Sequence, residues 1–176
     1  MFDITPYLEL KIAPRAVFDA LGERRARPRF MLPTPSGDWQ AVTWGAYADA
    51  IRKLGCALGA LGLSPGDRAA IYAPNRVEWI EAALAIQAAG GVMVPVYPAC
   101  TAEQTAYIVA HSDAKVLFVD TAPLLSRVLE RFGEMSAVER VIVLDDALDV
   151  SQVLAELRAQ GKAVPSVAEV EERFLS

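Results

Sequence analysis

The sequence lacks the glycine-rich loop with which many enzymes bind a nucleotide phosphate. Such loops need glycines because backbone amides must approach the phosphate oxygens closely. Gly90-Gly91 stands between a predicted helix and a predicted strand, which is the wrong end of such a unit. Gly161-Lys162 has neither the preceding glycine spacing nor a following hydroxyl residue. These observations exclude an autonomous phosphate site.

Cysteine and histidine are also scarce. The two cysteines, Cys56 and Cys100, have no metal-binding or redox spacing, so we expect a reduced, cytoplasmic protein. Cys100 has no evident base beside it in the sequence, which argues against a cysteine nucleophile. The single histidine, His111, has no cysteine or serine partner nearby, and we interpret it as a surface or capping residue. No catalytic or metal-binding residue is predicted.

A basic surplus and long apolar runs are missing as well. The net charge of -5 excludes a global basic field for nucleic acid. The longest apolar window, 82–96, is interrupted by glycine and proline and is too short to span a bilayer. The first ten residues show no signal sequence, which again points to the cytoplasm.

The sequence does contain a regular alternation of strand-like and helix-like segments. Between Asp67 and Asp120, three strand-like runs alternate with two helical runs, a pattern that predicts a parallel βαβαβ unit. A β-hairpin is predicted at 29–43, around turn residues 34–38. We therefore expect residues 1–176 to form one domain with a largely parallel, doubly wound sheet flanked by helices. The predicted strands are 69–73, 92–96, 116–119 and 141–144, with the first beside the second and third. The predicted helices are 14–26, 44–61, 76–89, 102–111, 121–132, 151–160 and 167–174. Thr43 is expected to cap the second of these, and Gly62 to end it in a left-handed conformation.

The residues that follow each strand are the candidates for a ligand site, because open parallel sheets bind ligands beyond the carboxyl ends of their strands. We expect Asn75 to cap the next helix in a capping box with Glu78, and Asp120 to cap another. The acidic residues within 145–149 could bind a cation, but we interpret them as caps. These candidates are Pro74, Asn75, Arg76, Tyr97, Pro98, Asp120, Thr121, Asp145 and Asp146.

Two further groups are weighed in the same way. The arginine-rich segment 23–29 could contact an anion, but cations are favourable at a helix C-terminus, so we interpret it as a solvated helix end. Trp39, Trp44 and Trp79 are interpreted as packing anchors, because no basic stripe accompanies them.

Several segments resemble, in their order and spacing, the motifs of adenylate-forming enzymes. The segment 42–47, VTWGAY, resembles the first core motif of that family, although Ala46 stands where an acidic residue is common. The segment 86–96, IQAAGGVMVPV, resembles the second. Between them, 61–68 (LGLSPGDR) and 75–79 (NRVEW) also look like that family.

The segment after the second core motif is closer to one branch of the family. Tyr97-Pro98 followed by 101–108, TAEQTAYI, looks more like the long-chain fatty acyl-CoA synthetases, although Ala99-Cys100 departs from their hydroxyl-rich residues. We expect the family-motif positions to be structural. They are Thr43, Asn75, Arg76, Glu78, Trp79, Gly90, Pro95, Tyr97 and Pro98.

The resemblance implies a two-step ligase. In that family a carboxylate attacks the ATP α-phosphate with magnesium, and the CoA thiol then displaces AMP from the acyl-adenylate. The family's T-S-G-T-T-G-x-P-K-G loop and its catalytic lysine are absent here, so no catalytic residue carries over. We therefore expect an inactive scaffold, the N-terminal subdomain of the large domain of a long-chain fatty acid–CoA ligase. The catalytic core and small domain would be absent, and the ATP, magnesium and CoA sites would belong to the parent.

The expected partner is the remainder of the parent ligase. At high concentration we also expect self-association, unless the C-terminal helices fold back over the exposed apolar surface. Two alternatives stay open. One is a different adenylate-forming acyl or aryl ligase, and the other is an autonomous flavodoxin-like binding module, which would need an acidic pocket or phosphate loop after the first strand.

Overall fold

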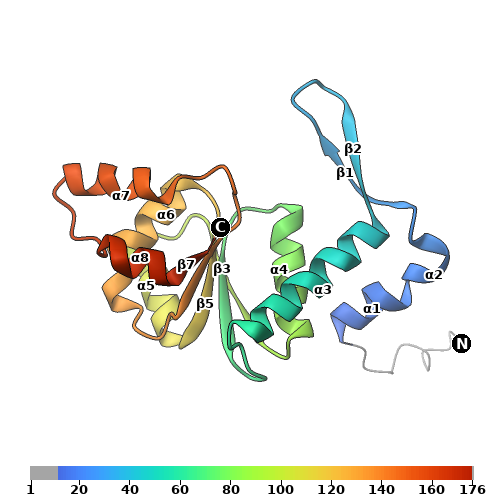
Figure 1. Ribbon diagram of the computed structural model, residues 1–176, viewed down its shortest axis with the longest axis horizontal. Helices are drawn as coiled ribbons and strands as arrows, with labels where there is room; N and C mark the ends of the chain where they lie inside the picture. The colour runs from blue at the N-terminus through green and yellow to red at the C-terminus, as the bar shows by residue number, and fades with distance from the viewer. Residues whose placement is uncertain (1–11, 176) are drawn as a thin grey trace, which may run out of the picture.

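The computed structural model describes residues 12–175, so the prediction made for the first ten residues lies outside them. The described residues form an α/β body from which a two-stranded hairpin projects at one end (Figure 1). The predicted fold class, a largely parallel sheet flanked by helices and preceded by a hairpin, is confirmed.

The body is built on a five-stranded sheet in which every pair of neighbours is parallel. The strand order is β4-β3-β5-β6-β7, so the prediction that the first parallel strand lies between the second and third is confirmed. The strands are β3 (Arg68–Tyr72), β4 (Val92–Val96), β5 (Ala114–Val119), β6 (Arg140–Val143) and β7 (Phe174–Leu175). The two-residue strand β7 was not predicted, because the helical pattern runs on to Phe174.

Helices cover both faces of this sheet (Figure 1). The α-helices of the described residues are α1 (Ala13–Asp19), α2 (Leu21–Arg24), α3 (Trp44–Ala60), α4 (Val77–Ala88), α5 (Ala102–His111), α6 (Ala122–Glu130), α7 (Val150–Ala159) and α8 (Val167–Arg173). Of these, α1 and α2 pack against α3. Successive strand residues point to opposite faces. Tyr72 packs with α5 and α6, whereas Ile71 packs with α3 and α4. Because both faces are covered, the central strands are nearly continuous apolar runs.

The ends of several helices follow from local sequence signals. The Thr43 hydroxyl accepts a hydrogen bond from the Ala46 amide at 3.1 Å and so caps α3 as predicted. Gly62 follows this helix with φ +98°, a backbone conformation that residues with a Cβ rarely adopt. Thr101 caps α5 in a reciprocal capping box with Gln104. The predicted bounds of α5 agree with the structure.

The predicted helix 14–26 is instead divided into α1 and α2, which meet at Ala20. Gly22 lies in the second piece, and glycine is a poor residue for continuing a helix. The base of the hairpin packs with α1, α3 and the start of α4 in a small apolar cluster around the fully buried Ile51.

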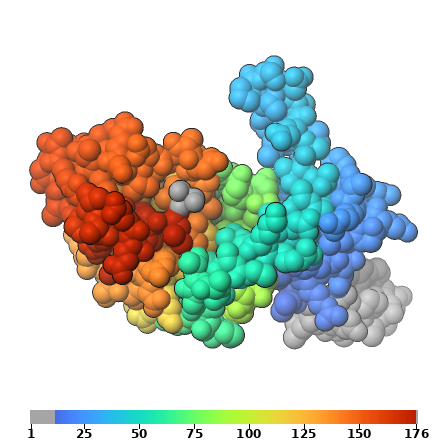
Figure 2. Space-filling view, in the orientation of Figure 1, coloured from blue at the N-terminus to red at the C-terminus, as the bar shows by residue number. Residues whose placement is uncertain are grey.

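The hairpin itself consists of β1 (Pro28–Pro33) and β2 (Trp39–Thr43), paired antiparallel as predicted. Its turn is closed by a hydrogen bond from the Thr34 amide to the Asp38 carbonyl at 2.9 Å. Beyond its base the hairpin stands clear of the body in the space-filling view (Figure 2).

Candidate functional site

The carboxyl edge of the parallel sheet brings together most of the residues that were predicted as ligand candidates. Arg76 follows β3, and Asp120 follows the neighbouring strand β5, so the two lie side by side although 44 residues separate them. The Arg76 guanidinium forms an ion pair with the Asp120 carboxylate, whose side chain is only 4% exposed. The same guanidinium donates from Nε to the Glu78 carboxylate at 2.7 Å.

This arrangement corrects two predictions about caps. The residue that caps α4 is Arg76, and its side chain makes no capping hydrogen bond, so Asn75 is not the cap and forms no capping box with Glu78. Thr121 stands at the cap position of α6, so Asp120 does not cap that helix either. The buried Asp120 carboxylate is instead neutralised by Arg76, because a buried charge needs an opposite charge close by. Arg76 in turn holds the pKa of Glu78 below its usual value.

A second polar cluster fixes the loop that follows β4. The Tyr72 hydroxyl donates to the Cys100 carbonyl at 2.8 Å. Arg127, from α6, donates through Nη1 to the carbonyls of Pro98 and Cys100 at 2.9 and 3.1 Å, and to the Tyr72 hydroxyl at 3.0 Å. The same loop leaves the Tyr97 side chain 75% exposed. Sequence reasoning did not identify Tyr72 and Arg127, because a strand tyrosine and a helix arginine show no sequence signal that they converge on one loop.

Two further acidic side chains, Asp145 and Asp149, accept hydrogen bonds from the backbone. Asp149 caps α7 by accepting from the amides of Ser151 and Gln152 at 2.9 and 3.1 Å. Asp145 accepts from the amide of Ala147 at 3.1 Å. The interpretation of this segment as caps is therefore confirmed for Asp149, whereas Asp145 stabilises the turn before the helix. Among residues 12–175, no group of three or more His, Cys, Asp or Glu side chains could hold a metal ion.

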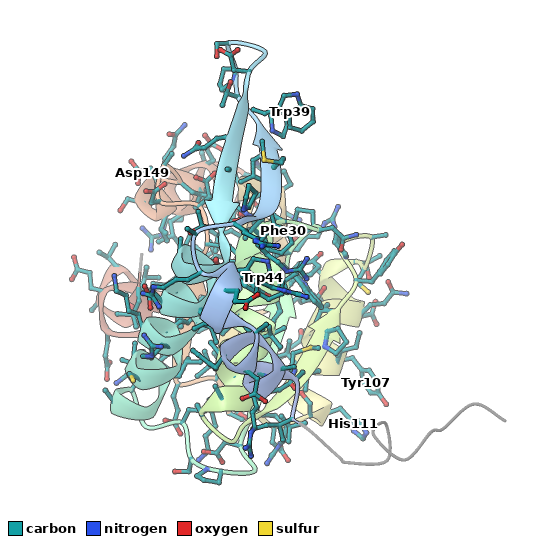
Figure 3. All side chains as sticks on the ribbon, turned by 90° about the vertical axis from the view of Figure 1, so that its right-hand side faces the viewer. Phe30, Trp39, Trp44, Tyr107, His111 and Asp149 are labelled. Atoms are coloured by element: carbon teal, nitrogen blue, oxygen red, sulfur yellow. The ribbon has the colours of Figure 1, made fainter. Side chains whose placement is uncertain are left out.

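The other singled-out residues are dispersed. His111 is exposed in the last turn of α5, with its ring stacked on that of Tyr107 at 5.4 Å between centroids (Figure 3). The prediction of a surface histidine is thus confirmed. The Cys100 side chain is half-buried and packs against the core. Gly90 has φ +84°, and a Cβ there would lie 3.3 Å from Pro65.

The three tryptophans differ in their packing. Trp79 packs partly buried against the sheet core, and Trp44 against the cluster at the base of the hairpin, as predicted. Trp39 is 64% exposed on the hairpin, so its prediction as a packing anchor is wrong for the described residues. The arginine-rich segment is more than a helix end, since α2 stops at Arg24 and Arg29 lies 4.8 Å over the Trp44 ring.

At the carboxyl edge, several charged side chains are already engaged within the chain. The guanidinium group of Arg76 is neutralised by two carboxylates. The acidic side chains at Asp145 and Asp149 accept backbone hydrogen bonds. The edge also contains the loop after β4, whose carbonyls accept hydrogen bonds from Tyr72 and Arg127 and in which Tyr97 is exposed.

Comparison with known proteins identifies the family. The sequence matches the family described as AMP-binding enzyme over residues 19–173. The chain belongs to this family. The resemblance that the sequence motifs indicated is thereby confirmed, and the flavodoxin-like alternative is set aside. The family match spans the hairpin, the parallel sheet and the carboxyl edge.

Among curated proteins, the chain is similar to acyl-CoA ligases. The long-chain-fatty-acid–CoA ligase FadD15 of Mycobacterium tuberculosis is 37% identical over 106 residues, which cover 60% of this chain and 18% of that ligase. The medium-chain-fatty-acid–CoA ligase of Ectopseudomonas oleovorans is 31% identical over 109 residues, covering 62% of this chain and 20% of that ligase. The chain thus spans about a fifth of the length of these relatives.

Solved structures show the same fold. A benzoate CoA ligase from Burkholderia xenovorans LB400 superimposes with a TM-score of 0.67 and 21% identity, over 90% of this chain and 30% of that chain. The anthranilate CoA ligase AuaEII gives a TM-score of 0.67 and 21% identity, over 86% of this chain and 28% of that chain. The five-stranded sheet and its helices are therefore an arrangement found within longer adenylate-forming ligases.

Proposed function

We propose that this chain is the N-terminal scaffold of a long-chain fatty acid–CoA ligase, working in the cytoplasm. The observation that carries the proposal is the family match over residues 19–173, together with 37% identity to a long-chain ligase over 106 residues. Among residues 12–175, no helix is long and apolar enough to cross a membrane.

The role of scaffold is supported by the carboxyl edge of the sheet. In this proposal the parent ligase joins a fatty acid to CoA through an acyl-adenylate, using ATP and magnesium bound elsewhere in the polypeptide. The residues of this chain shape that large domain. The ion pair of Arg76 and Asp120 ties the start of α4 to the end of β5, and Arg127 fixes the loop after β4.

The experiment is a pyrophosphate-exchange assay on the isolated chain with ATP, magnesium and palmitate. We expect exchange to stay at background, because this sequence contains neither the family's phosphate-binding loop nor its catalytic lysine. A full-length acyl-CoA ligase under the same conditions is the positive control. Clear acyl-adenylate formation by the isolated chain would contradict the scaffold role.

A second candidate is an adenylate-forming ligase for a different acid. It is favoured by the 33% identity, over 104 residues, to 4-hydroxybutyrate–CoA ligase 2 of Metallosphaera sedula, which lies close to the identity with the medium-chain ligase. The longer gene product that contains this chain would decide between the two. Comparing its turnover with palmitate, octanoate, 4-hydroxybutyrate and benzoate separates a long-chain ligase from the alternatives.

Self-association of the isolated chain remains a proposal. The C-terminal helices α7 and α8 fold back onto the body, where Leu157 and Val170 join the core cluster. This covers part of the surface that was expected to drive association. Light scattering over a range of concentrations tests whether the apolar surface left uncovered causes the chain to self-associate.

A further inference from the structure

The hairpin carries apolar side chains on both of its faces. The antiparallel register pairs Met31 with Ala41 and Pro33 with Trp39, so these four residues share one face, here called the outer face. Phe30, Leu32 and Val42 lie on the opposite, inner face and contact the cluster at the hairpin base. A two-stranded hairpin with polar surroundings normally has one apolar face at most, because the other meets water.

The outer face is uncovered. Met31 is 48% exposed and Trp39 is 64% exposed, and both Pro33 and Ala41 are exposed as well. In the side view, the Trp39 ring stands away from the strands near the hairpin tip, far from Phe30 and Trp44 at the base (Figure 3). An isolated two-stranded hairpin is only marginally stable in water, so such a face is expected to be covered in the working protein.

The inner face is only partly covered. Phe30 packs edge-on against the buried Tyr47 ring, with 5.2 Å between centroids. Farther along the strand, Leu32 lines an open groove together with Val77 and Ile80 at the start of α4. The groove is mainly apolar, although Asn75 and Arg76 also border it. Apolar contact surface is therefore available on both sides of the same strand pair.

Arginines near the base of the hairpin determine the charge that a docking surface should carry. The guanidinium groups of Arg24, Arg27 and Arg29 form no ion pair with a carboxylate among residues 12–175. Arg24 and Arg29 lie over the Trp44 ring, at 5.9 and 4.8 Å from its centroid. A surface that docks on the hairpin should therefore be apolar at its centre and carry carboxylates at its rim.

We infer that the hairpin is an interior strand pair of the full ligase, docked by both faces against the remainder of the same polypeptide. This inference rests on the proposed function. It is supported by the solved relatives, in which the matched fold occupies only 28–30% of the chain. A second copy of this chain fits less well, because it would bring two sets of unpaired arginines to one interface.

The test is a chimera in which this chain replaces the matched segment of the Mycobacterium tuberculosis long-chain ligase. Hydrogen exchange is measured on the amides of residues 28–43 in the isolated chain and in the chimera. We expect exchange to slow by about tenfold or more in the chimera, since burial on both faces suppresses local opening. Acyl-adenylate formation by the chimera is measured separately and reports on the proposed function.

Matched variants locate the docking surface. Trp39→Ser removes an aromatic side chain that is 64% exposed on the outer face, and Tyr107→Ser removes one that is 66% exposed on α5. In the isolated chain neither variant should change the melting temperature. In the chimera, Trp39→Ser should lower it by several degrees and Tyr107→Ser should not. The same measurements are made on a second chimera, built with the Ectopseudomonas oleovorans ligase. This second chimera is the control for misfolding of the first.

The outcomes separate the two proposals. An active chimera with fast-exchanging hairpin amides would overturn the docking inference and leave the proposed function standing. An inactive chimera with protected hairpin amides would overturn the proposed function and leave the docking of the hairpin standing. Protection of the isolated chain that appears only at high concentration, or only with phosphatidylglycerol vesicles, would assign the face to a second copy or a lipid surface and overturn the inference. Failure of both chimeras to fold would also overturn it.

Discussion

Strand β5 in the parallel sheet and strand β1 in the hairpin are both rich in apolar residues, but their surroundings differ. Five of the six residues of β5 are buried, because helices cover both faces of the sheet. None of the six residues of β1 is buried: Phe30 and Leu32 are half-buried, and the other four are exposed. The comparison teaches that an apolar strand is buried only where other elements pack on both of its faces. Within this chain, β1 is packed on one face and only in part.

The largest expected effect tests this difference directly. Phe118→Ala, at a fully buried position of β5, should lower the free energy of unfolding by about 3–5 kcal/mol, because it leaves a cavity in the sheet core. Met31→Ala in β1 should change it by less than about 0.5 kcal/mol. Urea denaturation of both variants measures the difference. Equal losses would mean that the hairpin is packed as firmly as the sheet.

The next effect concerns the ion pair that joins α4 to β5. Arg76→Met should cost about 3 kcal/mol, because it leaves the buried Asp120 carboxylate without a partner. Adding Asp120→Asn to the same chain should restore part of the loss. A double-mutant cycle by urea denaturation isolates the coupling. Loss of the same size in a matched surface variant, Arg131→Met, whose partner Glu134 is exposed, would argue against a special role of burial.

A smaller effect separates a true cap from an expected one. Thr101→Ala removes the capping box of α5 and should cost about 1 kcal/mol. Asn75→Ala removes a side chain that caps no helix and should cost less than about 0.5 kcal/mol. Thermal unfolding of the two variants side by side decides the point. A larger loss for Asn75 would restore the capping role that the sequence predicted.

The smallest effect is a pH dependence at the boundary between the hairpin cluster and the sheet. Burial, followed by the charge of Glu78, raises the pKa of Glu81 to about 7 from 4.5. The folded state then holds a proton that the unfolded state has released, so stability should fall as pH rises from about 4.5 to 7. The effect is small because the side chain is only half-buried.

The variant Glu81→Gln checks the sign of this pH dependence, and Glu78 provides a contrast. Glu81→Gln should remove the decline, so that its melting temperature changes less between pH 5 and 8 than that of the natural chain. Glu78 should behave oppositely, since Arg76 lowers its pKa and its contribution to stability is lost on acidification. An unchanged profile in Glu81→Gln would show that the Glu81 carboxyl is ionised in the folded protein at pH 5.

Local features of the fold were predictable because their signals lie within a few residues. Thr43 was identified as a cap and Gly62 as a left-handed helix end, and the structure confirms both. The bounds of α5 and of β4 were also predicted from the sequence. Hydroxyl caps, glycine and the periodicity of apolar residues act over one helical turn or one strand, so a single sequence contains the whole signal.

The candidate site was predictable in place but not in chemistry. The sequence placed Arg76, Tyr97 and Asp120 at one edge of the sheet, because parallel strands end together. It could not show that Arg76 pairs with Asp120, nor that Arg127 reaches the loop after β4. Both contacts join residues that lie 29 or more positions apart.

The sequence by itself determined the alternation of strands and helices, some of the helix ends and the membership of a ligase family, since each depends on residue types at short spacing. Only the tertiary structure decided which charges neutralise one another and which apolar strand remains uncovered. Asp120 has the same sequence signal as a helix cap, and Trp39 the same as a core anchor. What separates them from those roles is the neighbour that the fold supplies: Arg76 beside Asp120, and no packing layer over Trp39. A buried carboxylate requires an opposite charge, and an apolar face requires a second surface, and both are properties of the assembled layers.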